Sequence, residues 1–122
     1  MSFTINKIDH VQLAMPKGLE DEARKFYGEI LGLGEVDKPE TLRKRGGVWF
    51  AKGAVHFHLG VEEPFVPAKK AHPAFEVYQI EEFKHYLSAQ AVDYTVDENF
   101  PGANRIYVSD PFGNRLEFLE WQ

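Results

Sequence analysis

The 122-residue chain contains no cysteine, and this absence restricts the chemistry open to it. Without thiolates it can form no disulfide, zinc finger or iron–sulfur cluster, so any metal site must use nitrogen and oxygen donors. No apolar run approaches the roughly 20 residues that span a bilayer. The start, Met1-Ser2-Phe3-Thr4, lacks the basic and apolar regions of a signal peptide. We therefore expect a soluble, cytoplasmic protein with no membrane partner.

Basic residues are in the minority, which argues against nucleic acid as a partner. The net charge is -5 and the sequence pI is near 5.5, whereas binding to a phosphate backbone depends on clustered lysine and arginine. The short basic run Arg43-Lys44-Arg45 is expected to be a solvated strand or loop. A hydrophobic fraction of 43% over this length indicates one domain, residues 1–122, with a single core.

Hydrophobic periodicity predicts a strand, a helix and three strands, written twice. The sequence thus indicates an α+β fold in which paired βαβββ modules, about 1–62 and 71–122, form a curved mixed sheet around a central cleft. After a first strand containing His10, the expected elements are a helix at 19–31, strands near 36–44, 47–52 and 54–61, a strand at 72–79, a helix at 81–90, and strands near 92–97, 104–109 and 114–121.

Four residues able to hold a metal ion alternate with apolar neighbours in these strand-like runs: His10, His58, His72 and Glu117. Because side chains alternate between the two faces of a strand, the apolar neighbours can pack under helices while these four collect on the opposite face. The spacing repeats as well, at 48 residues (58 − 10) and 45 residues (117 − 72). The pattern predicts one metal site in the cleft.

The same alternation predicts further cleft residues, for which two roles are open. Trp49 and Tyr107 either fill the cavity or contact an aromatic or anionic substrate. His56 either lines the cavity or bonds a carboxylate behind a metal ligand. The candidates for substrate binding are Gln12, Trp49, His56, Arg105 and Tyr107, with Glu76 as a further cleft residue.

Four motifs, in their order and spacing, resemble the vicinal oxygen chelate superfamily over essentially the whole chain. That superfamily includes glyoxalase I, fosfomycin-resistance thiol transferases, extradiol dioxygenases and bleomycin-resistance proteins. The motifs are Ile8-Asp9-His10-Val11, Phe26-Tyr27-Gly28-Glu29-Ile30-Leu31-Gly32-Leu33, Ala71-His72-Pro73-Ala74-Phe75 and Tyr107-Val108-Ser109-Asp110-Pro111-Phe112-Gly113-Asn114-Arg115-Leu116-Glu117.

The resemblance implies that His10, His72 and Glu117 are the metal ligands. The fourth ligand of glyoxalase I, a glutamate, matches His58 by strand alternation, or Phe57 by alignment through Ala54-Val55. The paired glutamates of that enzyme shuttle a substrate proton, so Glu117 and His58 are the candidate catalytic groups. Its glutathione-binding arginine is replaced here by Glu29, which argues against glutathione-dependent activity.

As a function, the resemblance implies a metal-dependent enzyme of the glyoxalase or dioxygenase type. It would be a lyase or isomerase, a thiol transferase or a dioxygenase. The expected cofactor is one divalent ion per site, Fe2+, Mn2+, Ni2+ or Zn2+, and the expected partners are a small substrate that chelates the metal through vicinal oxygens and a second copy in a homodimer. The alternative is a metal-free protein of the bleomycin-resistance type that sequesters a drug or metabolite.

Overall fold

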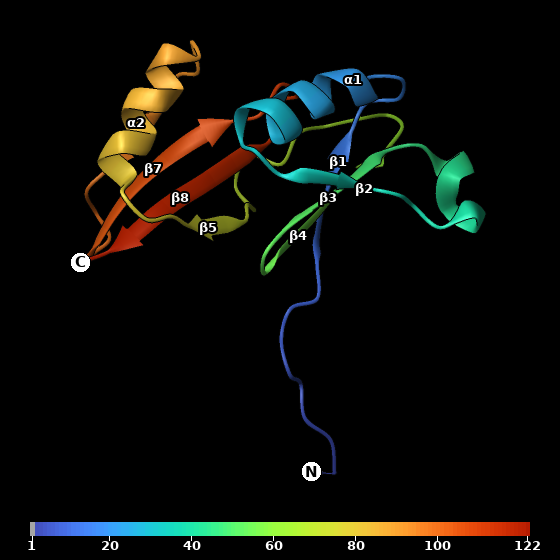
Figure 1. Ribbon diagram of the computed structural model, residues 1–122, viewed down its shortest axis with the longest axis horizontal. Helices are drawn as coiled ribbons and strands as arrows, with labels where there is room; N and C mark the ends of the chain where they lie inside the picture. The colour runs from blue at the N-terminus through green and yellow to red at the C-terminus, as the bar shows by residue number, and fades with distance from the viewer. Residues whose placement is uncertain (1) are drawn as a thin grey trace. The chain divides into compact units, whose positions relative to one another are not determined.

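The chain divides into two compact units, one ending at Glu63 and the other beginning at Pro64. The computed structural model describes residues 2–122. Each unit, called unit 1 and unit 2 below, contains a strand, a helical segment and three further strands (Figure 1). This order confirms the α+β fold with two βαβββ modules. That the two units together form one domain stays a prediction.

Unit 1 is a four-stranded mixed sheet with one helical segment between its first two strands. The strand order is β1-β4-β3-β2; β1 and β4 are parallel, and the other neighbours are antiparallel. The elements are β1 (Val11–Met15), α1 (Glu20–Ala23), a π-helical continuation of α1 (Arg24–Ile30), β2 (Gly34–Val36), a 3-10 helix (Glu40–Arg45), β3 (Val48–Lys52) and β4 (Val55–Val61).

Unit 2 repeats this plan with the same pairing. Its strand order is β5-β8-β7-β6, and β5 and β8 are again the parallel pair. The elements are β5 (Ala74–Glu76), α2 (Ile80–Ala89), β6 (Thr95–Asp97), β7 (Ala103–Ser109) and β8 (Arg115–Trp121).

In each unit the helix packs against the apolar face of the sheet, which leaves the opposite face free for polar side chains. In unit 1 the buried ring of Tyr27 lies 5.0 Å from Phe57 and 5.8 Å from Phe50, measured between ring centroids. In unit 2, Phe83 of α2 lies 4.9 Å from Phe118 of β8. Because strand residues alternate, the neighbours of these core residues point away from the helices.

The predicted strand at 36–44 is wrong. Only Gly34–Val36 is a strand, and residues 40–45 form the 3-10 helix, with hydrogen bonds from Leu42 N to Pro39 O (2.8 Å) and from Gly46 N to Arg43 O (3.2 Å). Pro39 explains the difference, since proline interrupts a strand and favours the start of a helical turn. The basic run 43–45 therefore belongs to a helix, contrary to the expected strand or loop.

The remaining elements agree with the prediction except at their ends. The strand expected at 72–79 is limited to Ala74–Glu76, and that expected at 92–97 to Thr95–Asp97. Residues 110–114 form a turn between β7 and β8, in which the Asp110 carboxylate accepts hydrogen bonds from the backbone N–H groups of Phe112 and Asn114. Among residues 2–122, no helix has the length and apolar character needed to cross a bilayer.

Candidate functional site

Three stacked rings stand on the polar face of unit 1. His58 of β4 lies opposite Trp49 of β3, with ring centroids 3.9 Å apart and planes within 5°. The other side of His58 stacks on His10, which directly precedes β1, at 4.3 Å. Burial between these rings lowers the pKa of His58, and the neighbouring His10 adds to the effect. The neutral form of the His58 ring is therefore favoured.

His10 is fixed by its sequence neighbour. Its Nδ1 lies 3.0 Å from Oδ2 of Asp9, which leaves Nε2 as the outward nitrogen. A carboxylate on one ring nitrogen orients a histidine and raises the basicity of the other, as is common for metal-ligating histidines. The same contact with His10 lowers the pKa of Asp9.

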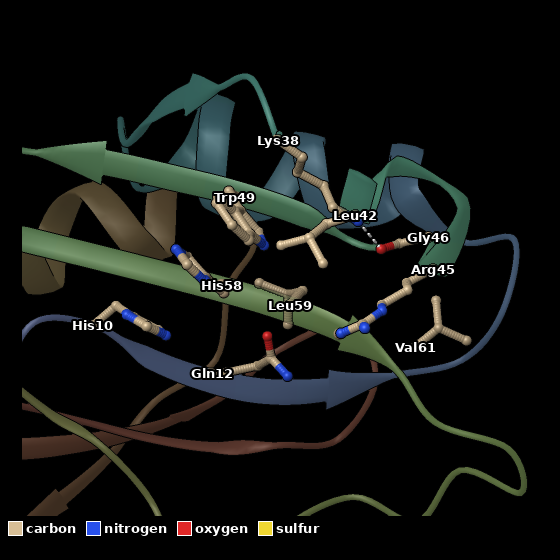
Figure 2. Close-up of a pocket in the computed structure, with 11 residues that line it drawn as sticks. His10, Gln12, Lys38, Leu42, Arg45, Gly46, Trp49, His58, Leu59 and Val61 are labelled. Carbon is tan, nitrogen blue, oxygen red and sulfur yellow. Dashed lines mark hydrogen bonds between the residues drawn. The ribbon is translucent and has the colours of Figure 1, made fainter. Parts of the chain in front are cut away.

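A cavity of about 350 Å³ opens beside this stack within unit 1. Figure 2 shows His10 at one end of it and Arg45 and Gly46 at the other. Two cationic side chains reach it from the segment between β2 and β3. The lining residues are His10, Gln12, Lys38, Leu42, Arg45, Gly46, Trp49, His58, Leu59, Gly60 and Val61.

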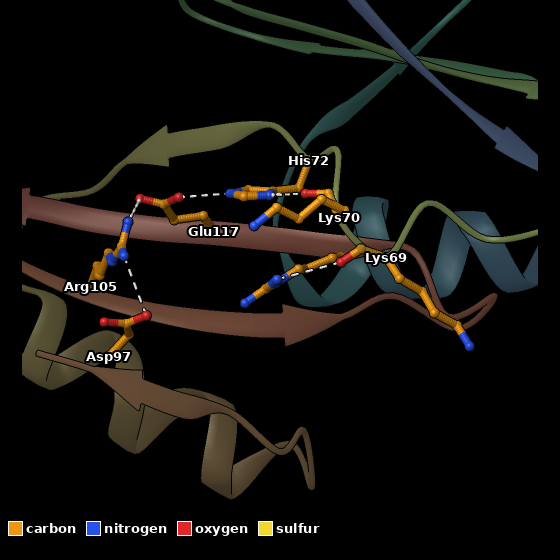
Figure 3. Close-up of polar contacts among 7 residues, drawn as sticks. Lys69, Lys70, His72, Asp97, Arg105 and Glu117 are labelled. Carbon is orange, nitrogen blue, oxygen red and sulfur yellow. Dashed lines mark hydrogen bonds and ion pairs between the residues drawn. The ribbon is translucent and has the colours of Figure 1, made fainter. Parts of the chain in front are cut away.

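The polar face of unit 2 carries a histidine–carboxylate pair. His72 Nε2 lies 2.8 Å from Oε1 of Glu117, and His72 Nδ1 lies 2.8 Å from the carbonyl oxygen of Lys70 (Figure 3). A carbonyl oxygen only accepts, so Nδ1 carries the proton in this contact. Nε2 then faces the carboxylate either with a second proton or with its lone pair directed at a cation shared with Glu117.

Arg105 contacts Glu117 on the side away from His72 and links it to Asp97. Its guanidinium lies 3.5 Å from Oε2 of Glu117 and 3.3 Å from Oδ2 of Asp97. The pKa of Asp97 is lowered by a hydrogen bond from the backbone N–H of Asn99 and also by Arg105. Tyr107 borders the group, with its ring 5.3 Å from His72 and 3.8 Å below the guanidinium of Arg115.

The polar side chains of the two units occupy matching positions. Trp49 pairs with His58 across β3 and β4, and Tyr107 pairs with Glu117 across β7 and β8. In the parallel strand pairs, Gln12 lies beside His58 and Ala74 lies beside Glu117. His10 precedes Gln12 by two residues (12 − 10), and His72 precedes Ala74 by two residues (74 − 72). His58 is thus the unit 1 counterpart of Glu117, whereas Phe57 is buried on the helix-facing side.

The structure brings the predicted site residues together in two groups. In unit 1, His10, His58, Trp49 and Gln12 border the cavity. In unit 2, His72, Glu117, Arg105 and Tyr107 are in contact. His56 is exposed and lies outside the cavity lining, and Glu76 is exposed as well. Within residues 2–122 no group of three or more histidine or acidic side chains has a geometry that could hold a metal ion.

Two cavity residues, Lys38 and Arg45, were not predicted from the sequence. Lys38 and Arg45 belong to a segment without periodicity, and the basic run was expected to be solvated. Lys38 reaches the cavity because its Nζ donates to the carbonyl oxygen of Gly46. The available signal was Pro39, which marks the start of the 3-10 turn at residues 40–45.

The model of the Glyoxalase/Bleomycin resistance protein/Dioxygenase superfamily matches residues 7–118. The chain belongs to this superfamily. A glyoxalase family protein from Bacillus anthracis has a crystal structure with 54% sequence identity and a TM-score of 0.96, and each chain covers 100% of the other. This similarity extends the superfamily assignment to the whole length of the chain.

Two more distant proteins resemble the chain, one in structure and one in sequence. Lactoylglutathione lyase from Agrobacterium tumefaciens has 21% identity and a TM-score of 0.75, with 95% of this chain and 94% of that chain covered. Glyoxylase I 4 of Arabidopsis thaliana is 26% identical over an alignment of 107 residues, and 80% of this chain is covered. The match spans 62% of the length of that plant protein.

Proposed function

We propose that this superfamily member is a metal-dependent enzyme of the glyoxalase or dioxygenase type. One divalent ion, Fe2+, Mn2+, Ni2+ or Zn2+, would be held by His10, His72 and Glu117, with His58 as a fourth ligand or a proton acceptor. Its substrate would be a small molecule that chelates the ion through two vicinal oxygens. The observation that carries this proposal is the contact between His72 Nε2 and Glu117 Oε1 at 2.8 Å.

The donor atoms in unit 2 suit a divalent ion. Nδ1 of His72 donates to Lys70 O, so the lone pair of a neutral ring lies on Nε2, next to a carboxylate oxygen. Two donors 2.8 Å apart are close enough to be neighbours around one ion of the zinc or iron type, whose bonds to nitrogen and oxygen are about 2.0–2.2 Å. Arg105 contacts the other carboxylate oxygen, so Oε1 is the oxygen of Glu117 that would be available to an ion.

The donors in unit 1 complement that pair. His10 is oriented by Asp9, and His58 is kept neutral by burial, which is the form that binds metals or accepts protons. Three neutral histidines and one carboxylate around a dipositive ion leave a net charge near +1, which attracts an anionic chelating substrate. When bound, the ion would act as a Lewis acid on the chelating oxygens.

The residues around the proposed ligands would bind and orient the substrate. Trp49 and Gln12 border the cavity beside His58, and Tyr107 lies against His72. Arg105 would hold Glu117 in place, and His58 would take the substrate proton, as a neutral imidazole can at pH 7. We further propose that the protein is a cytoplasmic homodimer.

A metal-free protein that sequesters a drug or metabolite is the second candidate. The cavity of about 350 Å³ with a tryptophan in its wall favours this function, because an aromatic-lined cavity binds flat ligands without any metal. This candidate also agrees with the lack of a three-ligand group among residues 2–122.

Elemental analysis of protein purified without a His tag or chelator distinguishes the two candidates. We expect near-stoichiometric divalent metal in the wild type and its loss in His10→Ala and Glu117→Ala. The matched control is His85→Ala, which removes an exposed histidine from α2 and should leave the metal in place. A wild type that carries no metal and takes up no added divalent ion would overturn the metal proposal and make sequestration the leading candidate.

A further inference from the structure

The cavity of unit 1 has a cationic end that the proposed metal site does not use. Lys38 and Arg45 line it, and no carboxylate occurs among its lining residues. This composition is unusual for a chain of net charge -5, in which acidic residues outnumber basic ones by 19 to 14. A region of positive charge against an acidic background concentrates small anions locally.

Within the described part of the chain, Arg45 has no carboxylate partner to neutralise it. Arg24 and Arg105 each contact two carboxylates, whereas no ion pair or side-chain hydrogen bond of Arg45 occurs in the described residues 2–122. Figure 2 shows its guanidinium on the cavity side, toward Gln12 and Leu59. Arg45 is exposed, and a guanidinium at the cavity wall with no carboxylate beside it has its donors available for a ligand.

Lys38 adds a second, partly buried charge close by. Its ammonium group donates to Gly46 O, which fixes the group at the cavity and leaves two further N–H donors. Burial lowers the pKa of Lys38, and Arg45 contributes to this shift, so the two charges are near enough to repel each other. The carboxylate of Glu20, which opposes the shift, already accepts a hydrogen bond from Gly47 N at 3.0 Å. An anion between the two cations would relieve their repulsion.

We propose that Lys38 and Arg45 bind a carboxylate or phosphate group of the ligand, whose flat apolar part lies against Leu42 and Trp49. This inference deepens the proposed function, because it assigns the substrate an anionic group at the end of the cavity opposite His10. The ligand class is therefore an organic anion in which a planar group separates the charged group from the chelating oxygens.

The test is a binding titration of chelator-treated, metal-free protein with three probes of the same ring: naphthoate, naphthyl phosphate and uncharged naphthamide. Calorimetry gives the affinities. The NMR signal of the Trp49 indole N–H reports on the cavity, and that of Trp121, which lies in unit 2, is the internal reference. We expect at least one anion to bind about tenfold or more tightly than naphthamide, the ratio typical of a charge-assisted hydrogen bond.

Three variants identify which cationic side chains bind the anionic probe. Arg45→Gln and Lys38→Gln should each lower the affinity for the anion about tenfold and leave that for naphthamide unchanged. Lys44→Gln removes the same charge from the same 3-10 helix at a residue outside the cavity lining, and should change either affinity less than about twofold. Equal affinities for anions and amide, an equal loss in Lys44→Gln, or a shift confined to Trp121 would overturn the inference.

The outcome is independent of the metal proposal because the protein is metal-free. Stoichiometric metal in a protein that does not discriminate anions would overturn only the anion site. Discrimination of anions by a protein that takes up no metal would support the anion site and overturn only the metal site. The relative affinities of naphthoate and naphthyl phosphate identify which anionic group the cavity prefers.

Discussion

Arg105 lies between two carboxylates, and its removal would leave the buried one, Glu117, with His72 as its remaining side-chain partner in the described part of the chain. Glu117 is only 5% exposed, and its partners are His72 and Arg105. Asp97, on the other side of the guanidinium, is more accessible and is also stabilised by the backbone of Asn99. The cost of losing Arg105 therefore depends mainly on Glu117.

We predict that Arg105→Gln lowers the free energy of unfolding of the metal-free protein by about 1–3 kcal/mol. The value is below that for fully buried ion pairs because the Arg105 side chain keeps some solvent contact, 17% of its surface. Urea unfolding followed by circular dichroism measures the effect. Lys44→Gln, which removes an exposed positive charge, should change the stability by less than about 0.5 kcal/mol.

A double variant tests whether this loss arises from the Glu117 carboxylate without its arginine. If it does, Arg105→Gln with Glu117→Gln should be at least as stable as Arg105→Gln alone, because the carboxylate that lost Arg105 is then absent. Additive losses from the two substitutions would contradict the pairing.

At the scale of the elements, the entry of the chain into β3 requires a glycine at position 47. Gly47 has φ +88°, and a Cβ there would lie 2.1 Å from the carbonyl oxygen of Leu59. The backbone N–H of Gly47 is in turn held by Glu20. The 3-10 helix and its cavity residues therefore connect to the sheet through a close backbone contact that no side chain permits.

We predict that Gly47→Ala destabilises the protein by about 3 kcal/mol or more, since the strain of a positive φ adds to a clash with backbone atoms. Gly53→Ala is the matched control: its φ is +57°, but no atom lies within 4 Å of the added Cβ, so about 1 kcal/mol is expected. Thermal unfolding measures both. Equal losses would show that φ strain alone matters and that the approach to Leu59 does not.

The N-terminus of α2 is capped by a residue from a strand. Both carboxylate oxygens of Glu120 in β8 accept backbone hydrogen bonds, one from Gln79 (3.0 Å) and one from Ile80 (3.1 Å). We predict that Glu120→Ala costs about 0.5–2 kcal/mol, as the loss of a helix cap and of a favourable charge at the helix dipole.

Amide hydrogen exchange of Gln79 and Ile80 tests this cap directly. Exchange of both amides should accelerate in Glu120→Ala. Glu82→Gln removes a charge from the first turn of the same helix, where no hydrogen bond to these amides occurs, and should leave their exchange nearly unchanged. Acceleration in both variants would assign the effect to the helix dipole alone.

These elements also show which parts of the molecule the sequence could predict. The helix at 19–31 and the faces of His58 and Glu117 were predictable because periodicity is a local property of helices and strands. The strand expected at 36–44 was not, since Pro39 and the contacts of Lys38 and Glu20 determine that segment. Cavity residues that depend on such tertiary contacts leave no periodic signal in the sequence.

At the scale of the whole molecule, the chain uses one βαβββ plan twice but places different chemistry on the two copies. Both units align an aromatic residue with a potential ligand at the same register, Trp49 with His58 and Tyr107 with Glu117. Unit 1 adds a cavity with two cations, whereas unit 2 adds the Arg105 network around its carboxylate. The repeat places side chains at equivalent positions, and the differences between the copies determine which chemical groups each unit presents there.

The segment before β1 bears on the proposed homodimer. Residues 2–10 belong to no helix or strand, and they carry Ile5 and Ile8 with exposed fractions of 85% and 78%. Burial of such a side chain contributes roughly 1.5–3 kcal/mol, so two of them can stabilise an interface substantially. We predict that the wild type sediments as a dimer of about 28 kDa, twice the 14.0 kDa chain, and that Ile5→Ser with Ile8→Ser weakens its association at least about tenfold.

Analytical ultracentrifugation over a range of protein concentrations measures this association. Val66→Ser is the control, because it replaces a similarly exposed apolar residue (69%) in the connection before β5. The control should dimerise as the wild type does, since its substitution changes the overall apolar surface but not the segment before β1. Sedimentation of the wild type at the monomer mass at every concentration would rule out the dimer, and an unchanged association in the double variant would exclude residues 5 and 8 from its interface.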